Sequence, residues 1–172
     1  PVSIPKQVII GEPTSLQVVR LHKGHLSMRV SIEGVSAHTG SPHLGKNALA
    51  EGGKVICALS ALSLQYEALR TDSSEHFPDV AKFPVLTVST VKSGSAINVV
   101  PDSFELGIGV RLLPDQNKEE VVAEIKKSIT DVCELPWNLE ELGDNPTMLT
   151  SENSAINKWL CEYIDQKGSV GV

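Results

Sequence analysis

The sequence predicts an α+β fold, a ferredoxin-like two-layer sandwich in which two helices cover one face of an antiparallel sheet of four to five strands. Two kinds of hydrophobic pattern predict it. Apolar and polar residues alternate over several short stretches, as in strands with one buried face, and apolar residues recur every three to four positions over two longer stretches, as in amphipathic helices. The elements follow one another as strand, strand, helix, strand, strand, helix and a further short strand. This order does not predict which strands are neighbours in the sheet.

The composition argues against several classes of function. The chain has 172 residues, of which 41% are hydrophobic, so it is large enough to bury a core. Its formal net charge of −6 argues against a nucleic acid or an anionic membrane as partner, because phosphate groups require Lys and Arg. No apolar run approaches the roughly 20 residues that cross a bilayer. The cysteines are odd in number and isolated in the sequence, which suits a reducing cytoplasm: Cys57, Cys133 and Cys161.

The first part of the chain contains three strand candidates. The apolar stretch Gln7–Ile10 ends in a turn at residues 11–14. Two further strands are predicted at Leu16–His22 and His25–Glu33, with Lys23–Gly24 as a tight turn between them. The last candidate alternates between two faces, with Leu26, Met28, Val30 and Ile32 on one and Ser27, Arg29, Ser31 and Glu33 on the other. One face of this strand is therefore expected to be buried.

A loop and a helix are predicted next. The polar segment 34–46 leads to a helix with Asn47 as its N-cap. Gly52 and Gly53 weaken this helix locally or permit close packing there. Residues 71–83 are expected to form a surface excursion. The apolar stripe of the helix consists of Leu49, Val55, Ile56, Leu59, Leu62, Tyr66 and Leu69.

The second half of the chain repeats this order. Strands are predicted at Val85–Lys92 and Ser103–Leu112, and the second of them alternates clearly between apolar and polar residues. Asn117 is expected to open the second helix, with Glu120 as its capping-box partner. A short strand around Trp137–Leu142 follows. The apolar stripe of the second helix consists of Val121, Val122, Ile125, Ile129 and Val132.

The two ends of the chain do not fit the sandwich. Residues 15–145 are expected to form it, whereas 1–14 and 146–172 are expected to be stubs of a second domain into which it is inserted. A helix predicted near Ser151 carries an apolar stripe that needs a partner, and the start at Pro1 without a methionine also suggests an excised piece. The alternative from another class is a free-standing regulatory or ligand-binding module of ferredoxin-like shape. Close packing of both ends onto the sandwich would favour that alternative.

Two residues of the first half are candidates for chemistry. Glu12 follows a predicted strand, where a carboxylate can bind zinc, although an acid in a solvated turn has the same pattern. His38 lies in a loop of small residues, where an imidazole can donate to a developing oxyanion or act as an acid. An ordinary surface histidine is the alternative. A metal pair of His38 with His43 is rejected, because no helix is predicted there and the loop has no further ligand.

Asn98 and Arg111 are the candidates of the second half. An amide beside a guanidinium group can bind a carboxylate with directed hydrogen bonds. The alternative is a turn asparagine and a surface arginine. The sequence has no phosphate-binding glycine loop and no nucleophile elbow. From residue types alone, the chain therefore has no complete active site.

Five short motifs, in this order, resemble the M20 family of metallopeptidases and deacylases, and most of all its acetylornithine deacetylases. The resemblance covers nearly the whole chain, so it is more specific than any one motif. The motifs are Gly11-Glu12-Pro13-Thr14, His22-Lys23-Gly24-His25, Gly34-Val35-Ser36-Ala37-His38, Gly45-Lys46-Asn47-Ala48 and Ile97-Asn98-Val99-Val100-Pro101.

The resemblance implies a two-domain enzyme. Its catalytic domain holds two zinc ions, with cobalt as an alternative metal, and an inserted ferredoxin-like domain forms the dimer and covers the site. Glu12 matches the family's metal-binding Glu. His38 matches a lid histidine that reaches the active site of the partner subunit and polarises the scissile carbonyl. Asn98 and Arg111 match lid residues that contact the substrate, Arg111 through its carboxylate.

The family's remaining ligands are absent from this sequence: its His-x-Asp motif, its bridging Asp, its Glu-Glu pair with the general base and its late His. They are expected before Pro1 and after Val172, so no metal is expected on this chain alone, which is expected to be inactive. The resemblance implies a cytoplasmic homodimer of arginine biosynthesis that pairs through a sheet edge and a neighbouring helix. Its substrate is a small N-acyl amino acid, N-acetylornithine, hydrolysed to ornithine and acetate. The alternatives are desuccinylation of succinyl-diaminopimelate, or the hydrolysis of a dipeptide or another acylated amino acid.

Overall fold

The computed structural model describes residues 6–167. The chain divides into two compact units: Pro1–His22 with Met148–Val172, called the terminal unit, and Lys23–Thr147, called the sandwich unit. Among the described residues, no helix combines the length and the apolar character needed to span a membrane.

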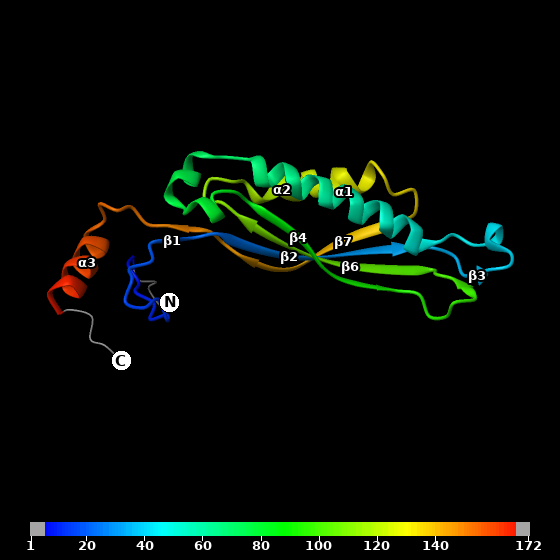
Figure 1. Cartoon of the computed structure of the whole chain (residues 1–172), viewed down its shortest axis with the longest axis horizontal. Helices are drawn as coiled ribbons and strands as arrows, with labels where there is room; N and C mark the ends of the chain where they lie inside the picture. Colours follow the sequence, from blue (N-terminus) through cyan, green and yellow to red (C-terminus); the bar gives the residue numbers. More distant parts are fainter. Residues whose placement is uncertain (1–5, 168–172) are drawn as a thin grey trace. The chain divides into compact units, whose positions relative to one another are not determined.

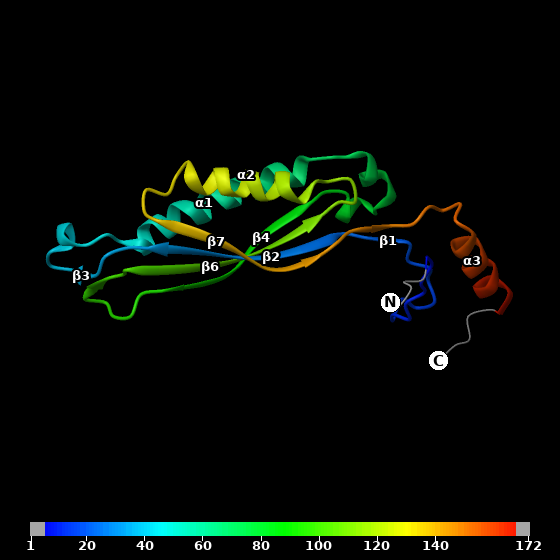
Figure 2. The same cartoon turned by 180° about the vertical axis from the view of Figure 1, so that it is seen from behind.

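The sandwich unit is an antiparallel sheet with two helices on one face (Figure 1). In sheet order its strands are β4 (Val85–Ser93), β6 (Ser103–Leu112), β2 (Gly24–Glu33) and β7 (Trp137–Asn145). The helices are α1 (Ala48–Ala68) and α2 (Lys118–Thr130), and the view from behind also has both on the same side of the sheet (Figure 2). This strand order and connectivity are ferredoxin-like, so the predicted fold class is confirmed.

The core lies between the sheet and the helices. The central strands β2 and β6 pair along their whole length, from Gly24 opposite Leu112 to Glu33 opposite Ser103. Alternate residues of both strands are buried beneath the helices, as the pattern predicted: Leu26, Met28, Val30, Ile32, Phe104, Leu106, Ile108 and Val110. The residues between them form the opposite face, which is polar and which neither helix covers.

Both predicted N-caps are confirmed. The Asn47 side chain accepts a hydrogen bond from the backbone N–H of Ala50 at 3.1 Å, at the start of α1. The Asn117 side chain accepts one from the backbone N–H of Glu120, also at 3.1 Å, at the start of α2. Each cap satisfies a backbone donor that the first helical turn leaves without a partner.

The two glycines of α1, Gly52 and Gly53, differ in the space around them. A Cβ atom at Gly52 would lie 2.4 Å from the Phe104 ring, so the helix can approach the sheet there only without a side chain. A Cβ at Gly53 would meet nothing within 4 Å. Close packing therefore explains Gly52 but not Gly53.

The predicted hairpin of Leu16–His22 and His25–Glu33 is wrong. The first strand, β1, contains only Leu21–His22 and pairs with β8 (Met148–Leu149) in the terminal unit, whereas β2 pairs with β6 and β7. Ser15 and Leu16 have φ angles of 55° and 61°, which no extended strand contains. A short turn signal does not show whether the strands on either side of it pair with each other.

Three boundaries also differ from the prediction. Within the described residues, Gln7–Ile10 forms no strand. Strand β7 continues past Leu142 to Asn145, where its charged residues form an exposed edge of the sheet. Helix α3 (Ala155–Lys167) begins four residues after Ser151.

Candidate functional site

His38 and Asn98 are brought together at one end of the sheet, where β2 finishes and β6 begins. Strand β3 (Ala37–His38) pairs with β5 (Val99–Val100), and His38 lies opposite Val99. The backbone N–H of Thr39 donates to the carbonyl of Asn98 at 3.0 Å. Both side chains are exposed. Segments that are far apart in the sequence therefore form one site, which is called the His38 end below.

The hydrogen bonds of His38 determine which ring nitrogen carries the proton. The backbone N–H of Gly40 donates to His38 Nδ1 at 3.0 Å, so Nδ1 is an acceptor. A neutral imidazole with Nδ1 as acceptor has its proton on Nε2. His38 therefore offers an Nε2–H donor for an oxyanion. This role of Gly40 was not predicted, although the His-Thr-Gly spacing is short enough for a local side-chain-to-backbone hydrogen bond.

Backbone hydrogen bonds hold the loop that carries His38. The N–H of Gly34 donates to the Asp102 carbonyl at 2.7 Å, and Val35 and Lys46 exchange hydrogen bonds of 2.9 and 2.8 Å. A Cβ at Gly34 would lie 2.2 Å from the Lys46 carbonyl oxygen. The two backbone segments can therefore meet only because residue 34 is a glycine.

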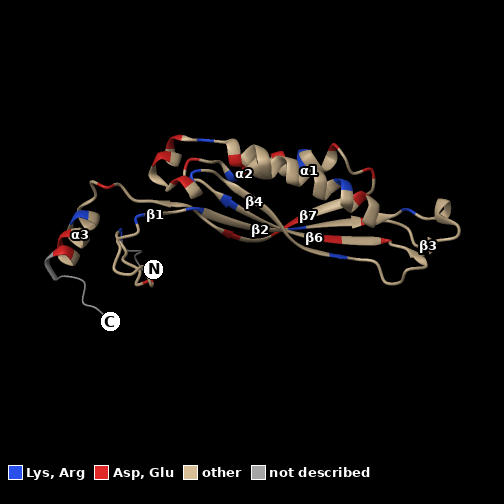
Figure 3. Cartoon of the chain, in the orientation of Figure 1, with Lys and Arg blue, Asp and Glu red and all other residues tan. Residues whose placement is uncertain are grey.

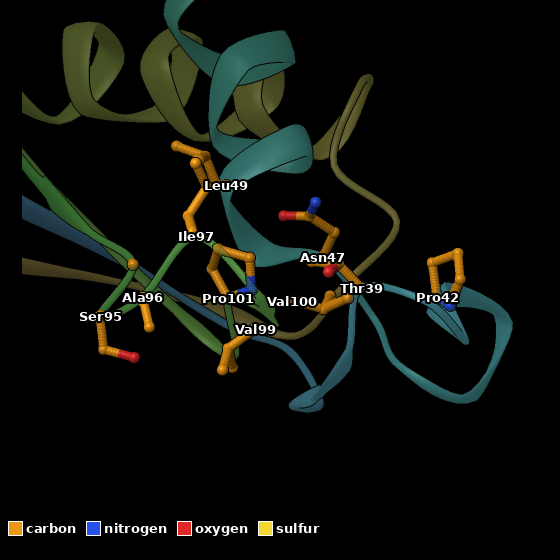
Figure 4. Close-up of a pocket in the computed structure, with 11 residues that line it drawn as sticks. Thr39, Pro42, Asn47, Leu49, Ser95, Ala96, Ile97, Val99, Val100 and Pro101 are labelled. Carbon is orange, nitrogen blue, oxygen red and sulfur yellow. The ribbon is translucent and has the colours of Figure 1, made fainter.

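A cavity of about 550 Å³ opens beside His38, at the start of α1 (Figure 4). Its walls come from the loop after His38, from α1 and from the loop before β5, and they include Thr39, Asn47, Leu49, Ile97, Val99 and Pro101. Most of this lining is apolar, and Ile97 is 100% exposed. The His38 end thus offers a histidine, an amide and an apolar surface, with no charged residue in the cavity wall.

Arg111 lies at the opposite end of the sheet. It is the penultimate residue of β6, and its side chain is exposed between its neighbours His25 on β2 and Val85 on β4. It lies eight positions after Ser103, which corresponds to roughly 26 Å along the strand. The structure therefore brings Asn98 beside His38 but does not bring Arg111 to them within one chain.

The surroundings of Arg111 are cationic and aromatic. In the part of the chain that the structure describes, the Arg111 side chain has no hydrogen bond and no ion pair. The neighbouring Lys23 Nζ donates to the Phe83 carbonyl at 2.5 Å and lies 5.7 and 5.5 Å from the ring centroids of Phe77 and Phe83. Burial and, to a smaller extent, the charge of Arg111 lower the pKa of Lys23. This region is called the Arg111 end below.

Asp115 holds the segment 71–83 at the Arg111 end. Its carboxylate accepts hydrogen bonds from Thr71 Oγ1 at 2.7 Å, from Ser73 Oγ at 2.6 Å and from the Ser73 N–H at 2.9 Å. Partial burial raises the pKa of Asp115, but these donors outweigh it and hold the pKa below its ordinary value. Ser73, Ser74 and Phe77 are buried, so the predicted surface excursion is anchored.

Glu12, the candidate metal ligand, lies in the terminal unit. Its side chain is exposed, and its carbonyl accepts a hydrogen bond from the Thr14 N–H at 2.8 Å. Across residues 6–167, no three His, Cys, Asp or Glu side chains cluster in a way that could hold a metal ion. These residues do not fit a two-metal centre by themselves.

A family model described as the peptidase dimerisation domain matches residues 20–134. The chain belongs to the M20 peptidase family. A probable carboxypeptidase of Ajellomyces dermatitidis is 38% identical over 125 residues, which are 72% of this chain and 28% of that protein. An acetylornithine deacetylase of Pectobacterium atrosepticum is 31% identical over 130 residues, 76% of this chain and 33% of that protein. This M20 chain thus spans about a third or less of these relatives.

Several solved structures have the same fold. The aminopeptidase PepT from Bacillus cereus matches with a TM-score of 0.62 and 16% identity, covering 87% of this chain and 37% of that one. AtUAH in complex with glyoxylate matches with a TM-score of 0.65 and 18% identity, covering 86% and 33%. At these identities the likeness supports the fold alone.

Proposed function

We propose that residues 15–145 are the dimerisation and lid domain of a metal-dependent amidohydrolase that acts on small N-acyl amino acids, and that residues 1–14 and 146–172 belong to its catalytic domain. The observation that carries the proposal is the separation of Arg111 from the site formed by His38 and Asn98. A donor for an oxyanion and a group for a carboxylate lie at opposite ends of one sheet, and β6 alone spans roughly 26 Å between Ser103 and Arg111. One chain cannot bring both to a small substrate, but two chains can.

The two sheet edges differ in their suitability for pairing. Strand β7 carries three acids, Glu140, Glu141 and Asp144, and charged residues discourage pairing at an edge. Strand β4 carries one charged residue, Lys92, and no acid (Figure 3). Val91 of β4 is 51% exposed at this edge. We therefore assign the dimer contact to β4 together with the neighbouring α1.

Antiparallel pairing of two β4 strands would explain how the ends meet. About a two-fold axis at Ser89, the middle of the strand, Ser93 of one chain lies opposite Val85 of the other. Val85 is the neighbour of Arg111, and Ser93 leads into the loop that carries Asn98. The His38 end of one subunit would then lie beside the Arg111 end of its partner.

Each side chain has a role in this arrangement. The Nε2–H of His38 donates to the oxygen of the scissile carbonyl as negative charge develops there. The Asn98 amide orients the acyl group, and the Arg111 guanidinium binds the carboxylate. Glu12 would supply one ligand of a zinc pair, or of cobalt, together with ligands from the rest of the catalytic domain. Such metals activate water and polarise the carbonyl.

N-acetylornithine is the first substrate to test, because the motifs resemble acetylornithine deacetylases and one relative of that name is 31% identical. That reaction would belong to arginine biosynthesis in the cytoplasm, and the three free cysteines suit that compartment. Carboxypeptidase action on a dipeptide is the second candidate, since a probable carboxypeptidase is 38% identical. Succinyl-diaminopimelate completes the substrate panel.

Subunit mixing in the longer enzyme tests the proposal. His38→Ala and Arg111→Ala are each expected to lower kcat/KM by at least about 100-fold without changing metal content, because each removes a charge-stabilising donor. After subunit exchange of equal amounts, about a quarter of the wild-type activity should return, because each heterodimer has one intact site. If no activity returns after subunit exchange, both residues act in the site of one subunit, and the proposal is wrong. His43→Ala is the control for a neighbouring loop histidine.

The proposed edge is tested separately on the chain itself. Val91→Lys should convert a dimer into a monomer in sedimentation equilibrium, because it buries a charge at the β4 edge. Val80→Lys is the matched control, since Val80 is 86% exposed and lies outside β4. If the wild-type chain is a monomer, or if the Val91→Lys variant is still a dimer, β4 does not form the interface.

A further inference from the structure

The open face of the sheet carries a cationic row at the Arg111 end. The strand registers place Arg111 of β6 directly beside His25 of β2, with Val85 and Asn145 on their outer sides. Side chains directly opposite one another on a sheet face have their Cβ atoms about 4.5–5.5 Å apart. A guanidinium and an imidazole therefore lie next to each other on the face that neither helix covers.

The next row of the same face has no bulk. It consists of Thr87, Gly109, Ser27 and Gly143. A Cβ at Gly109 would meet only His25 Nε2, at 3.9 Å, and one at Gly143 would meet only the Ser27 Cβ, also at 3.9 Å. Close packing does not require these glycines, because no other atom lies within 4 Å of either Cβ position.

The imidazole of His25 is oriented toward this space. Its Nε2 lies 3.4 Å from Ser27 Oγ and 3.9 Å from the position that a Cβ of residue 109 would occupy. On the far side of the floor, Arg29 and Glu140 form an ion pair of 3.4 Å. We call the space between that ion pair and the Arg111–His25 row the glycine trough.

The positive charge beside the trough favours an anionic ligand. The two rows contain no acidic residue. Among the residues that the structure describes, Arg111 has neither a hydrogen bond nor an ion pair. The Lys23 ammonium lies close enough to Arg111 to be affected by its charge. A guanidinium with a neighbouring N–H donor matches the two oxygens of a carboxylate.

We propose that His25 is a second carboxylate-binding residue beside Arg111, and that the bare floor at Gly109 makes room for the amino-acid part of the ligand. The ligand class is a small molecule with one free carboxylate. Arg111 binds one oxygen of the carboxylate and His25 donates to the other, while Ser27 keeps the imidazole over Gly109. The identity of the ligand as an N-acyl amino acid rests on the proposed function, but the binding of a carboxylate does not.

The test is a titration of the full chain, monitored by NMR. One ligand is N-acetylornithine, and the control ligand has a carboxamide in place of its carboxylate. The carboxylate should shift the His25 ring signals and the Gly109 amide with millimolar affinity, and the carboxamide should shift neither. With the Gly109 amide as reporter, His25→Gln should weaken binding about tenfold, the loss expected for one hydrogen bond to a charged group. No shift up to roughly 100 mM ligand, or a change of less than about twofold in His25→Gln, would overturn the proposal.

Two further variants separate binding from folding. Gly109→Val should fill the trough and abolish the shifts while the melting temperature is kept, because a Cβ there meets only one atom within 4 Å. His43→Gln and Gly53→Ala are controls outside the trough and should bind as the wild type does. If Gly109→Val binds normally, the ligand lies elsewhere and the proposal is wrong.

In the longer enzyme, His25→Gln should raise KM about tenfold and change kcat by less than about twofold, because it acts on the bound carboxylate and not on the reacting carbonyl. Hydrolysis with an unchanged KM would overturn the inference and leave the proposed function intact. A chain that binds the carboxylate through His25, in an enzyme that hydrolyses none of the tested amides, would leave the inference intact and overturn the proposed function.

Discussion

The two ends of the sandwich position their side chains by different means. At the His38 end, two short strands and a glycine contact hold exposed residues from segments that are distant in the sequence. At the Arg111 end, a ten-residue strand pair sets Arg111 beside His25, and side chains around Asp115 hold the adjoining loop. The first arrangement depends on the backbone fitting together, and the second on strand register and side-chain hydrogen bonds. Substitutions should therefore affect the two ends differently.

The largest effect is expected for Gly34→Ala at the His38 end. The added Cβ would lie 2.2 Å from the Lys46 carbonyl oxygen, so the two segments must separate. The free energy of unfolding should fall by about 3 kcal/mol, as for other overpacked sites. Thermal or urea unfolding measures the loss, and the amide signals of Gly40 and Asn98 should shift.

Gly53→Ala is the matched control for that substitution. Nothing lies within 4 Å of its Cβ, so the helix should become more stable by up to about 1 kcal/mol. If Gly34→Ala is as well tolerated as Gly53→Ala, the close backbone contact does not hold the His38 loop.

A smaller effect is expected for Asp115→Ala at the Arg111 end. Loss of the hydrogen bonds from Thr71 and Ser73 should cost about 1–2 kcal/mol at neutral pH. Because the pKa of Asp115 in the folded chain lies below 3.8, this stability is present above about pH 5 and is lost as the pH falls through the folded pKa. Urea unfolding of both proteins between pH 7 and pH 3 measures it. A difference that grows toward low pH would contradict the assigned direction.

The smallest effect is expected for the caps. Asn47→Ala and Asn117→Ala should each lower the free energy of unfolding by about 1 kcal/mol, because each leaves a helical N–H without its partner. Only Asn47 lines the cavity beside His38, so Asn47→Ala alone should also shift the His38 ring signals. Equal shifts in both variants would mean that the two ends are coupled through the sandwich.

Local patterns predicted most of the secondary structure. The alternation of β2 and β6 and the asparagine caps of both helices follow from residues next to one another in the chain. The predicted hairpin failed because β1 and β2, which only Lys23 separates, belong to two different units, and Gly24 is already the first residue of β2. Pairing depends on which apolar surfaces are buried together, and a two-residue turn does not contain that information.

The sequence by itself determined the fold class and the four candidate residues, because side-chain period, helix caps and motif order are local properties of the chain. Tertiary structure alone decided which residues share a site. The β3–β5 pair brings Asn98 to His38, and strand register places Arg111 beside His25 at the far end of the sheet. Such neighbours are set by the pairing of distant segments, whose free energy comes from the whole buried core and not from the sequence around any one residue.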